Sequence, residues 1–282
     1  MTLYLVLFFA FRSILPSKTN VTESGDDFPW KKSPSLTAHL IVALFAMIHW
    51  CYLGFRHILT YDFNGAIGED SESNLRALIF VPAGFEIAQR VMGALLIWDI
   101  PLSLVGGSGP PDVMMHYHHA GMVVVTACAL GLIKWPSESG DGIVGTHVAP
   151  IFLGVIELSS IPLQIVDMFH PKKSPHWYKY INDKSSSGSF PKLCASINEA
   201  SRILFALLFL LVRGLYFPYV VIAIAAPDFY AEGSLPSMVL FVMSVLFTML
   251  QLYWGKLVVG QVKKALFGDA KPSGKSKSNK GE

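Results

Sequence analysis

Charged residues are scarce in this chain, at 15% of its 282 residues. Soluble domains usually carry about 25% charged residues. Hydrophobic residues make up 52% of the chain, and the net charge is only +2. This composition favours a membrane protein over a soluble domain.

Cysteine is scarce as well. Cys51, Cys128 and Cys194 are scattered along the chain, and two of them lie inside apolar stretches. Their spacing fits neither a disulfide framework nor a metal site. Histidines occur close together near residue 118, but without the spacing of a metal motif. We therefore expect no metal.

Long apolar runs dominate the sequence instead. A transmembrane helix needs about 20 predominantly apolar residues. Six stretches approach or exceed that length: 37–55, 82–104, 117–134, 146–166, 200–224 and 237–259. We predict an all-α polytopic membrane protein with six transmembrane helices around a central cavity. The expected parts are a cytosolic or membrane-associated segment (1–35), a transmembrane domain (36–267) and a disordered basic tail (268–282).

The first 15 residues are apolar but lack a basic start and a small-residue cleavage site, which disfavours a signal peptide. They are short for a full span. We expect a membrane-associated hairpin or half-helix, with a seventh span as the alternative.

Basic residues mark one side of the membrane. They gather before the first stretch, in the loop 167–199 and after the last stretch, whereas the loops 56–81 and 225–236 are acidic. The positive-inside rule then places both termini in the cytosol. The glycosylation sequon at Asn20 should accordingly stay unmodified.

Ionisable residues inside the apolar stretches are the candidate site, because such residues are costly in a membrane unless they pair or function. Glu86 and Arg90 lie four apart and can neutralise each other. Asp99 either has a structural role, in which it caps the fold or meets a base on a neighbouring helix, or it orients a histidine on the next helix.

Three histidines open the third stretch. His116 and His119 share a helix face, and His118 points about 100° away from His119. At least one of them is a candidate general base. The alternative is that they contact only headgroups and water at the interface.

The remaining candidates lie in the last three stretches. Glu157, Ser160 and Gln164 form one polar stripe, and Glu157 is expected to pair with Arg213, the most costly residue in the chain. A headgroup contact is the alternative role for Arg213. Polar candidates near the helix ends are Asn198, Arg202 and Trp254.

The order of these motifs resembles the TLC domain, the multi-pass endoplasmic-reticulum family that includes the ceramide synthases. The resemblance covers residues 38–267 and is carried by Trp98-Asp99, His118-His119, Gly154, Glu157-Leu158-Ser159-Ser160, Pro162, Asn198, Phe209 to Arg213, and Gln251 to Trp254. It implies helices around a lipid-sized cavity, residence in the endoplasmic reticulum, and work on or regulation of membrane lipids. The chain is closest to the smaller TLC-domain transmembrane proteins, because the acids that follow the paired histidines in the synthases are missing.

Two functions follow as alternatives. The first is lipid homeostasis, in which the cavity binds or regulates membrane lipids without turnover. The second is an acyltransferase that uses acyl-CoA as co-substrate, with His118 or His119 as general base and Asp99 or Asp112 as its orienting carboxylate. The resemblance also allows a cargo receptor, but no residue in the sequence points to that function. We expect membrane lipids as partners, no nucleic acid, and no cofactor beyond that co-substrate.

Overall fold

The computed structural model describes residues 2–13, 29–60, 80–105, 113–134, 142–182 and 188–268. These residues form helices joined by turns, and none of them lies in a strand. Three sequence-based predictions fall outside them: the sequon at Asn20, the carboxylate of Asp112, and the tail beyond Gly268.

The helices follow one another in a simple order. The first half of the chain contains α1 (Thr2–Ser13), α2 (Pro29–Lys32), α3 (Pro34–Thr60), α5 (Pro82–Ala94), the π-helix η2 (Leu95–Asp99), α6 (Ile100–Leu104) and α7 (Val113–Ala129). The middle contains α8 (Ala149–Phe152), the 3₁₀-helix η3 (Val155–Ser159), α9 (Ser160–Met168) and α10 (Pro175–Asn182). The last part contains α11 (Ser189–Leu208), the π-helix η4 (Phe209–Tyr216), α12 (Phe217–Val220), the π-helix η5 (Val221–Ala225), α13 (Ala226–Glu232) and α14 (Leu235–Phe267).

Five helical stretches among the described residues are long and apolar enough to cross a membrane. They are Pro34–Leu59, Pro82–Leu104, Ala149–Met168, Ser189–Glu232 and Leu235–Phe267. The other expected span, 117–134, corresponds to α7, which has 17 residues. That is close to the lower limit of about 17 residues for a transmembrane helix.

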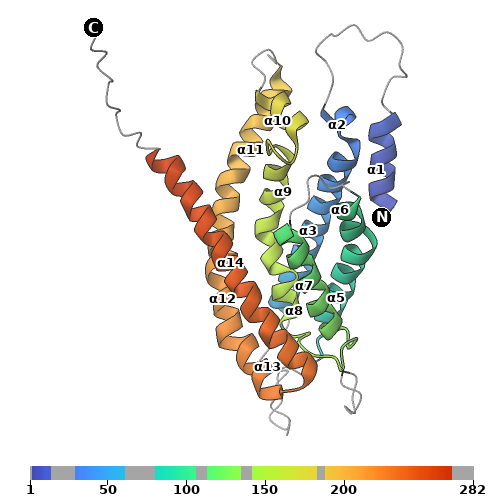
Figure 1. The fold of residues 1–282 in the computed structure, drawn as a ribbon, viewed down its shortest axis with the longest axis vertical. Coiled ribbons are helices and arrows are strands. Elements are labelled where there is room, and N and C mark those ends of the chain that lie inside the picture. Colours follow the sequence, from blue (N-terminus) through green and yellow to red (C-terminus); the bar gives the residue numbers. More distant parts are fainter. Residues whose placement is uncertain are drawn as a thin grey trace, which may run out of the picture.

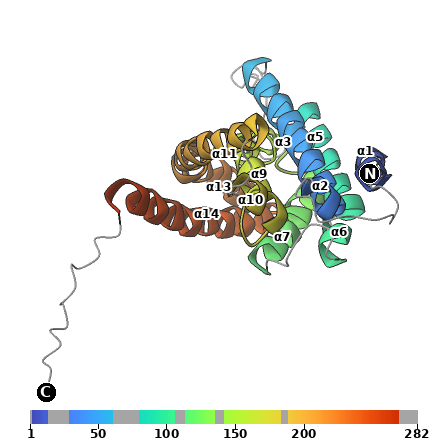
Figure 2. The same ribbon diagram turned by 90° about the horizontal axis from the view of Figure 1, so that it is seen from above.

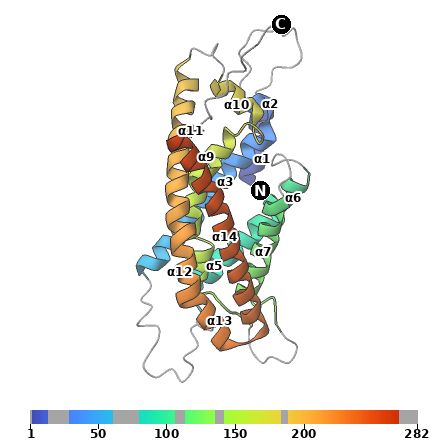
Figure 3. The same ribbon diagram turned by 60° about the vertical axis from the view of Figure 1, so that its left-hand side comes forward.

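The stretch from α8 to α9 lies inside the bundle. Figure 2 shows α9 with α3, α11 and α7 around it. Of the apolar window in Ala149–Met168, 67% is buried, against 28% to 44% for the other four stretches. Figure 3 shows α14 crossing the bundle obliquely, with α12 on one side and α7 on the other. The outer helices expose apolar side chains, including Ile203, Leu215 and Ile222.

The short helix α1 packs against the outside of α3 (Figure 1). The Tyr4 hydroxyl lies 2.9 Å from the Ser35 hydroxyl. Tyr4 and its neighbours also form a small apolar cluster with Ala38 and Trp98. At 12 residues, α1 is too short to cross the apolar part of a bilayer as a straight helix.

Each irregular helical segment contains the residue four positions before a proline. A proline has no N–H to donate to that residue's carbonyl, and its ring clashes with it. The pairs are Ile97 in η2 with Pro101, Leu158 in η3 with Pro162, Gly214 in η4 with Pro218, and Ala223 in η5 with Pro227. Prolines in the sequence thus account for where the regular α-helical turn is lost.

Candidate functional site

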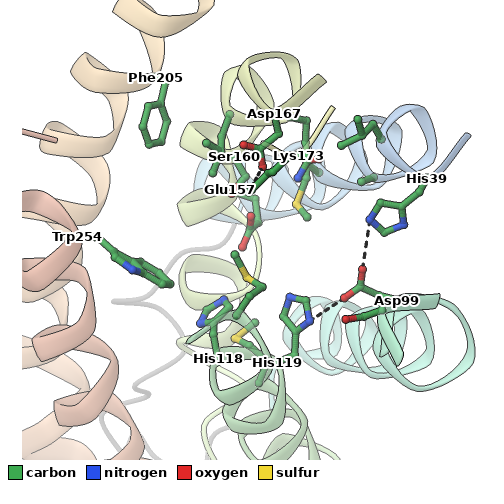
Figure 4. A pocket seen from close by; sticks show the side chains of 18 of the residues that line it. His39, Asp99, His118, His119, Glu157, Ser160, Asp167, Lys173, Phe205 and Trp254 are labelled. Carbon is green, nitrogen blue, oxygen red and sulfur yellow. Dashed lines mark hydrogen bonds and ion pairs between the residues drawn. The ribbon is translucent and has the colours of Figure 1, made fainter. Parts of the chain in front are cut away.

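A pocket of about 390 Å³ lies within the bundle, with walls from α3, from the α5–α6 stretch, and from α7, α9, α11–η4 and α14. Its apolar walls include Met47, Trp50, Val91 and Met122. Figure 4 shows ionisable side chains pointing into it, with Asp99 and His39 on one side and Glu157 and His118 on the other.

Three charged residues of this pocket lie in the irregular segments. Asp99 ends η2, Glu157 lies in η3, and Arg213 lies in η4. Local widening or tightening of a helix changes the direction of its side chains, and such turns recur at functional sites. The prolines downstream therefore help to aim these side chains.

Arg213 and Glu157 form a buried ion pair, which confirms the pairing expected from the sequence. Arg213 Nη2 lies 3.3 Å from Glu157 Oε2 and donates to Ser160 Oγ at 2.7 Å, and Arg213 Nε donates to Ser159 Oγ at 2.7 Å. A buried guanidinium needs both charge compensation and hydrogen-bond acceptors. Glu157 and the two serines supply them.

Asp99 faces two histidines. Its Oδ2 lies 2.8 Å from His119 Nδ1, and its Oδ1 lies 3.7 Å from His39 Nε2. The two atoms are close, but their alignment is poor for a hydrogen bond, and the contact is an ion pair only when the imidazole is protonated. Asp99 thus contacts a histidine of the next helix, His119, and also His39 of α3; both contacts fit the roles considered for it.

His118 lies among aromatic rings rather than beside a carboxylate. The centroid of its ring is 5.4 Å from that of Phe247 and 5.7 Å from that of Trp254, both on α14, and both contacts are edge-to-face. The neighbouring histidines thus have different surroundings, as their 100° separation on the helix requires.

Other candidate residues lie at or beyond the edge of the pocket. Ser160, Gln164 and Trp254 line it. His116 lies outside its lining and contacts the Ser103 hydroxyl through Nε2 at 2.5 Å. Asn198 is buried, and the exposed Arg202 is 3.7 Å from Glu199; neither lines the pocket.

An ion pair lies in the turn between α9 and α10. Lys173 Nζ donates to Asp167 Oδ2 at 2.6 Å, and both residues line the pocket. Nearby, His170 Nδ1 accepts from the backbone N–H groups of Lys172 and Lys173. Burial lowers the pKa of His170; Asp167 opposes this shift, and the two lysines add to it.

Sequence reasoning missed several members of this site. His39 packs on Trp98 with ring centroids 4.9 Å apart. The signal for His39 was present, because a histidine inside an apolar stretch calls for an explanation. Ser159 was part of the motif that carries the resemblance, but neither its contact with Arg213 nor the Asp167–Lys173 pair had a signal in the sequence, because these contacts depend on how the chain folds.

The arrangement offers imidazole nitrogens and a carboxylate to a ligand surrounded by apolar walls. Arg213 and Lys173 already have carboxylate partners, so neither is a free cation for an anionic group. In the part of the chain that the structure describes, no group of three or more histidine, cysteine or acidic side chains is placed to hold a metal ion. The imidazole and carboxylate groups that line the pocket can form hydrogen bonds and transfer protons.

No protein-family model, curated protein or solved structure matches the chain.

Proposed function

We propose that the chain crosses the membrane six times, with α7 as the third crossing and both termini in the cytosol. The position of α7, packed against α5 and α14, supports this. So do three lysines in or just before α10, Lys172, Lys173 and Lys179. The helix α10 packs against α2 at one end of the bundle (Figure 1), and basic residues favour the cytosolic side.

At this site the protein binds or regulates membrane lipids and acts in lipid homeostasis, as a TLC-like protein of the endoplasmic reticulum. The observation that carries the proposal is the pocket itself. Polar groups line it, while the outer helix faces carry many exposed apolar side chains. Ligand sites are typically apolar hollows with a few converging polar groups, and a lipid has both parts.

The pocket suggests how such a ligand would lie. The headgroup would contact His118, His119 and Asp99, whose nitrogens and oxygens offer hydrogen bonds. An acyl chain would lie against Met47, Trp50 and Met122. Because Arg213 is neutralised by Glu157, a neutral or zwitterionic headgroup fits better than a strongly anionic one.

Native mass spectrometry of the purified protein tests this proposal. We expect a co-purifying lipid that is reduced at least several-fold by the double substitution His118→Ala and His119→Ala. The matched control is His49→Ala, since His49 is an exposed histidine on α3. Equal lipid occupancy in the wild type and the double variant would contradict the assigned headgroup contact.

The second candidate is an acyltransferase, and the His119–Asp99 contact favours it. A carboxylate at Nδ1 fixes the imidazole so that Nε2 can act as a general base. Nε2 would take the proton of a lipid amine or hydroxyl, whose nitrogen or oxygen then bonds to the acyl carbon of acyl-CoA. The CoA thiolate leaves and receives a proton.

Reconstituted vesicles supplied with acyl-CoA and candidate lipid acceptors separate the two functions. Steady product formation that is lost in His119→Ala supports the acyltransferase. Lipid binding without turnover supports the homeostasis function, and acyl transfer unchanged in His119→Ala would exclude His119 as the base.

A further inference from the structure

A second, much smaller cavity lies behind His118. Its volume is about 20 Å³, and its lining includes His118, Glu157, Arg213, Phe247 and Gln251. A space of roughly 10–15 Å³ or more can hold one water molecule when polar partners surround it. The size of this cavity therefore suits a single water.

Two residues that line this cavity each have a buried polar side-chain atom without a hydrogen-bond partner in the described part of the chain. His118 Nδ1 and Gln251 Oε1 are both buried and have no hydrogen-bond partner among the described residues. Gln251 is 1% exposed and lies in the middle of α14. A buried polar atom without a partner is costly, and buried waters usually make about three hydrogen bonds to such groups.

We propose that this cavity is a binding site for one water molecule, held by Gln251, Glu157, Arg213 and His118, and that this water fixes the tautomer of His118. Gln251 is then a positioning residue that acts on His118 through the water. The small cavity and the two buried atoms, His118 Nδ1 and Gln251 Oε1, are present whether or not the protein binds a lipid.

The tautomer follows from the donors and acceptors around the water. A water donates two hydrogen bonds. Gln251 Oε1 and the Glu157 carboxylate can only accept, so they use both. The water can then only accept from its other two neighbours, the Arg213 guanidinium and His118. His118 must therefore carry its proton on Nδ1, which leaves the Nε2 lone pair free.

In this arrangement both adjacent histidines carry their proton on Nδ1, although their surroundings differ. Asp99 holds the Nδ1 side of His119, and the water holds the Nδ1 side of His118. Each histidine then keeps Nε2 as an acceptor. The consequence for ligands rests on the proposed function: the pocket would prefer a headgroup that donates two hydrogen bonds.

Nitrogen-15 NMR of protein labelled at histidine tests the inference in the full chain in nanodiscs. The His118 signals are assigned by their loss in His118→Asn. We expect the neutral ring to carry its proton on Nδ1, with a cross-peak from that proton to bound water. In the wild-type spectrum, either a proton on Nε2 or the absence of a water cross-peak would be enough to overturn the proposal.

Substitution of Gln251 gives the second arm. Gln251→Met keeps the side-chain length but removes the acceptor, so we expect loss of the water cross-peak and a mixture of His118 tautomers. Gln261→Met is the matched control on the same helix, because Gln261 does not border the small cavity. An unchanged His118 spectrum in Gln251→Met would contradict the proposal.

The two proposals can fail separately. The NMR result stands whether or not a lipid co-purifies, and loss of lipid binding in the histidine variants does not depend on the His118 tautomer.

Discussion

Arg213 shows how a single costly residue organises its surroundings. An arginine in mid-span costs about 2.5–3.5 kcal/mol on insertion scales. Here its guanidinium is held by Glu157 and by the hydroxyls of Ser159 and Ser160. These contacts join η4 to η3 and α9, and so connect the outer and inner helices.

Removal of one partner of the Arg213–Glu157 pair should destabilise the protein more than expected from the effect of removing both. Arg213→Met leaves Glu157 buried without its charge partner, and we expect a loss of about 3–5 kcal/mol in the free energy of unfolding. The double variant with Glu157→Met should lose clearly less than the sum of the two single variants. Unfolding of all four proteins in detergent measures this coupling; additive losses would show that the pair does not act as a unit.

The surroundings of His170, near α10, predict that the stability of the protein depends on pH. Its folded-state pKa is lowered, so its contribution to stability is fully present above the ordinary histidine value of about 6.5 and is lost as the pH falls through the folded pKa. Protonation of Nδ1 would also break its two contacts with backbone N–H groups.

His170→Asn keeps an acceptor near the same place but does not titrate. We expect the unfolding temperature of the wild type to fall more steeply than that of this variant as the pH decreases from 8 to 5. His176→Asn, at an exposed histidine of α10, should behave like the wild type. Parallel curves for the wild type and His170→Asn would contradict the prediction.

At the scale of elements, prolines and glycines set the geometry. Pro101, Pro162 and Pro218 follow the irregular segments that carry Asp99, Glu157 and Arg213. Glycines permit close backbone contacts between helices: a Cβ on Gly54 of α3 would lie 2.6 Å from the carbonyl oxygen of Pro150. Small residues allow helix backbones to approach in this way inside membranes.

Gly54→Ala should therefore destabilise the bundle. The new methyl group would meet backbone atoms that cannot move independently, and we expect a loss of about 1–3 kcal/mol, as for other overpacked sites. Gly93→Ala is the control, because a Cβ there meets nothing within 4 Å. Thermal unfolding of both variants should separate them; equal stability would mean that the α3 crossing tolerates extra volume.

The sequence predicted elements better than it predicted their contacts. Apolar length located the helices, and charge and spacing identified Glu86–Arg90 and Glu157–Arg213, both observed as ion pairs. The spacing of His118 and His119 also predicted that they face different ways. His39 and Ser159 joined the site only through packing between helices far apart in sequence, which local patterns do not encode.

At the scale of the whole molecule, the apolar outer surface is separate from the partly polar surface of the pocket. Apolar side chains such as Leu211, Leu215 and Ile222 face outward, whereas a group of ionisable residues lines the pocket within the bundle: His39, Asp99, His118, His119, Glu157 and Arg213. Where lipid surrounds a protein, its outer surface needs no polar side chains. Ionisable groups that point into the bundle are therefore candidates for a functional site. The proposed lipid site follows from this separation.

Photocrosslinking with a lipid that carries a diazirine near the end of its acyl chain tests the central claim most directly. We predict that labelled peptides will include the pocket residues Met47, Val91 and Met122, and that excess unlabelled lipid will compete for this labelling. Met122→Trp, which fills the pocket, should abolish it while labelling of Leu215 and Ile222 on the outer face persists. Labelling confined to the outer face in the wild type would contradict a lipid-binding pocket within the bundle.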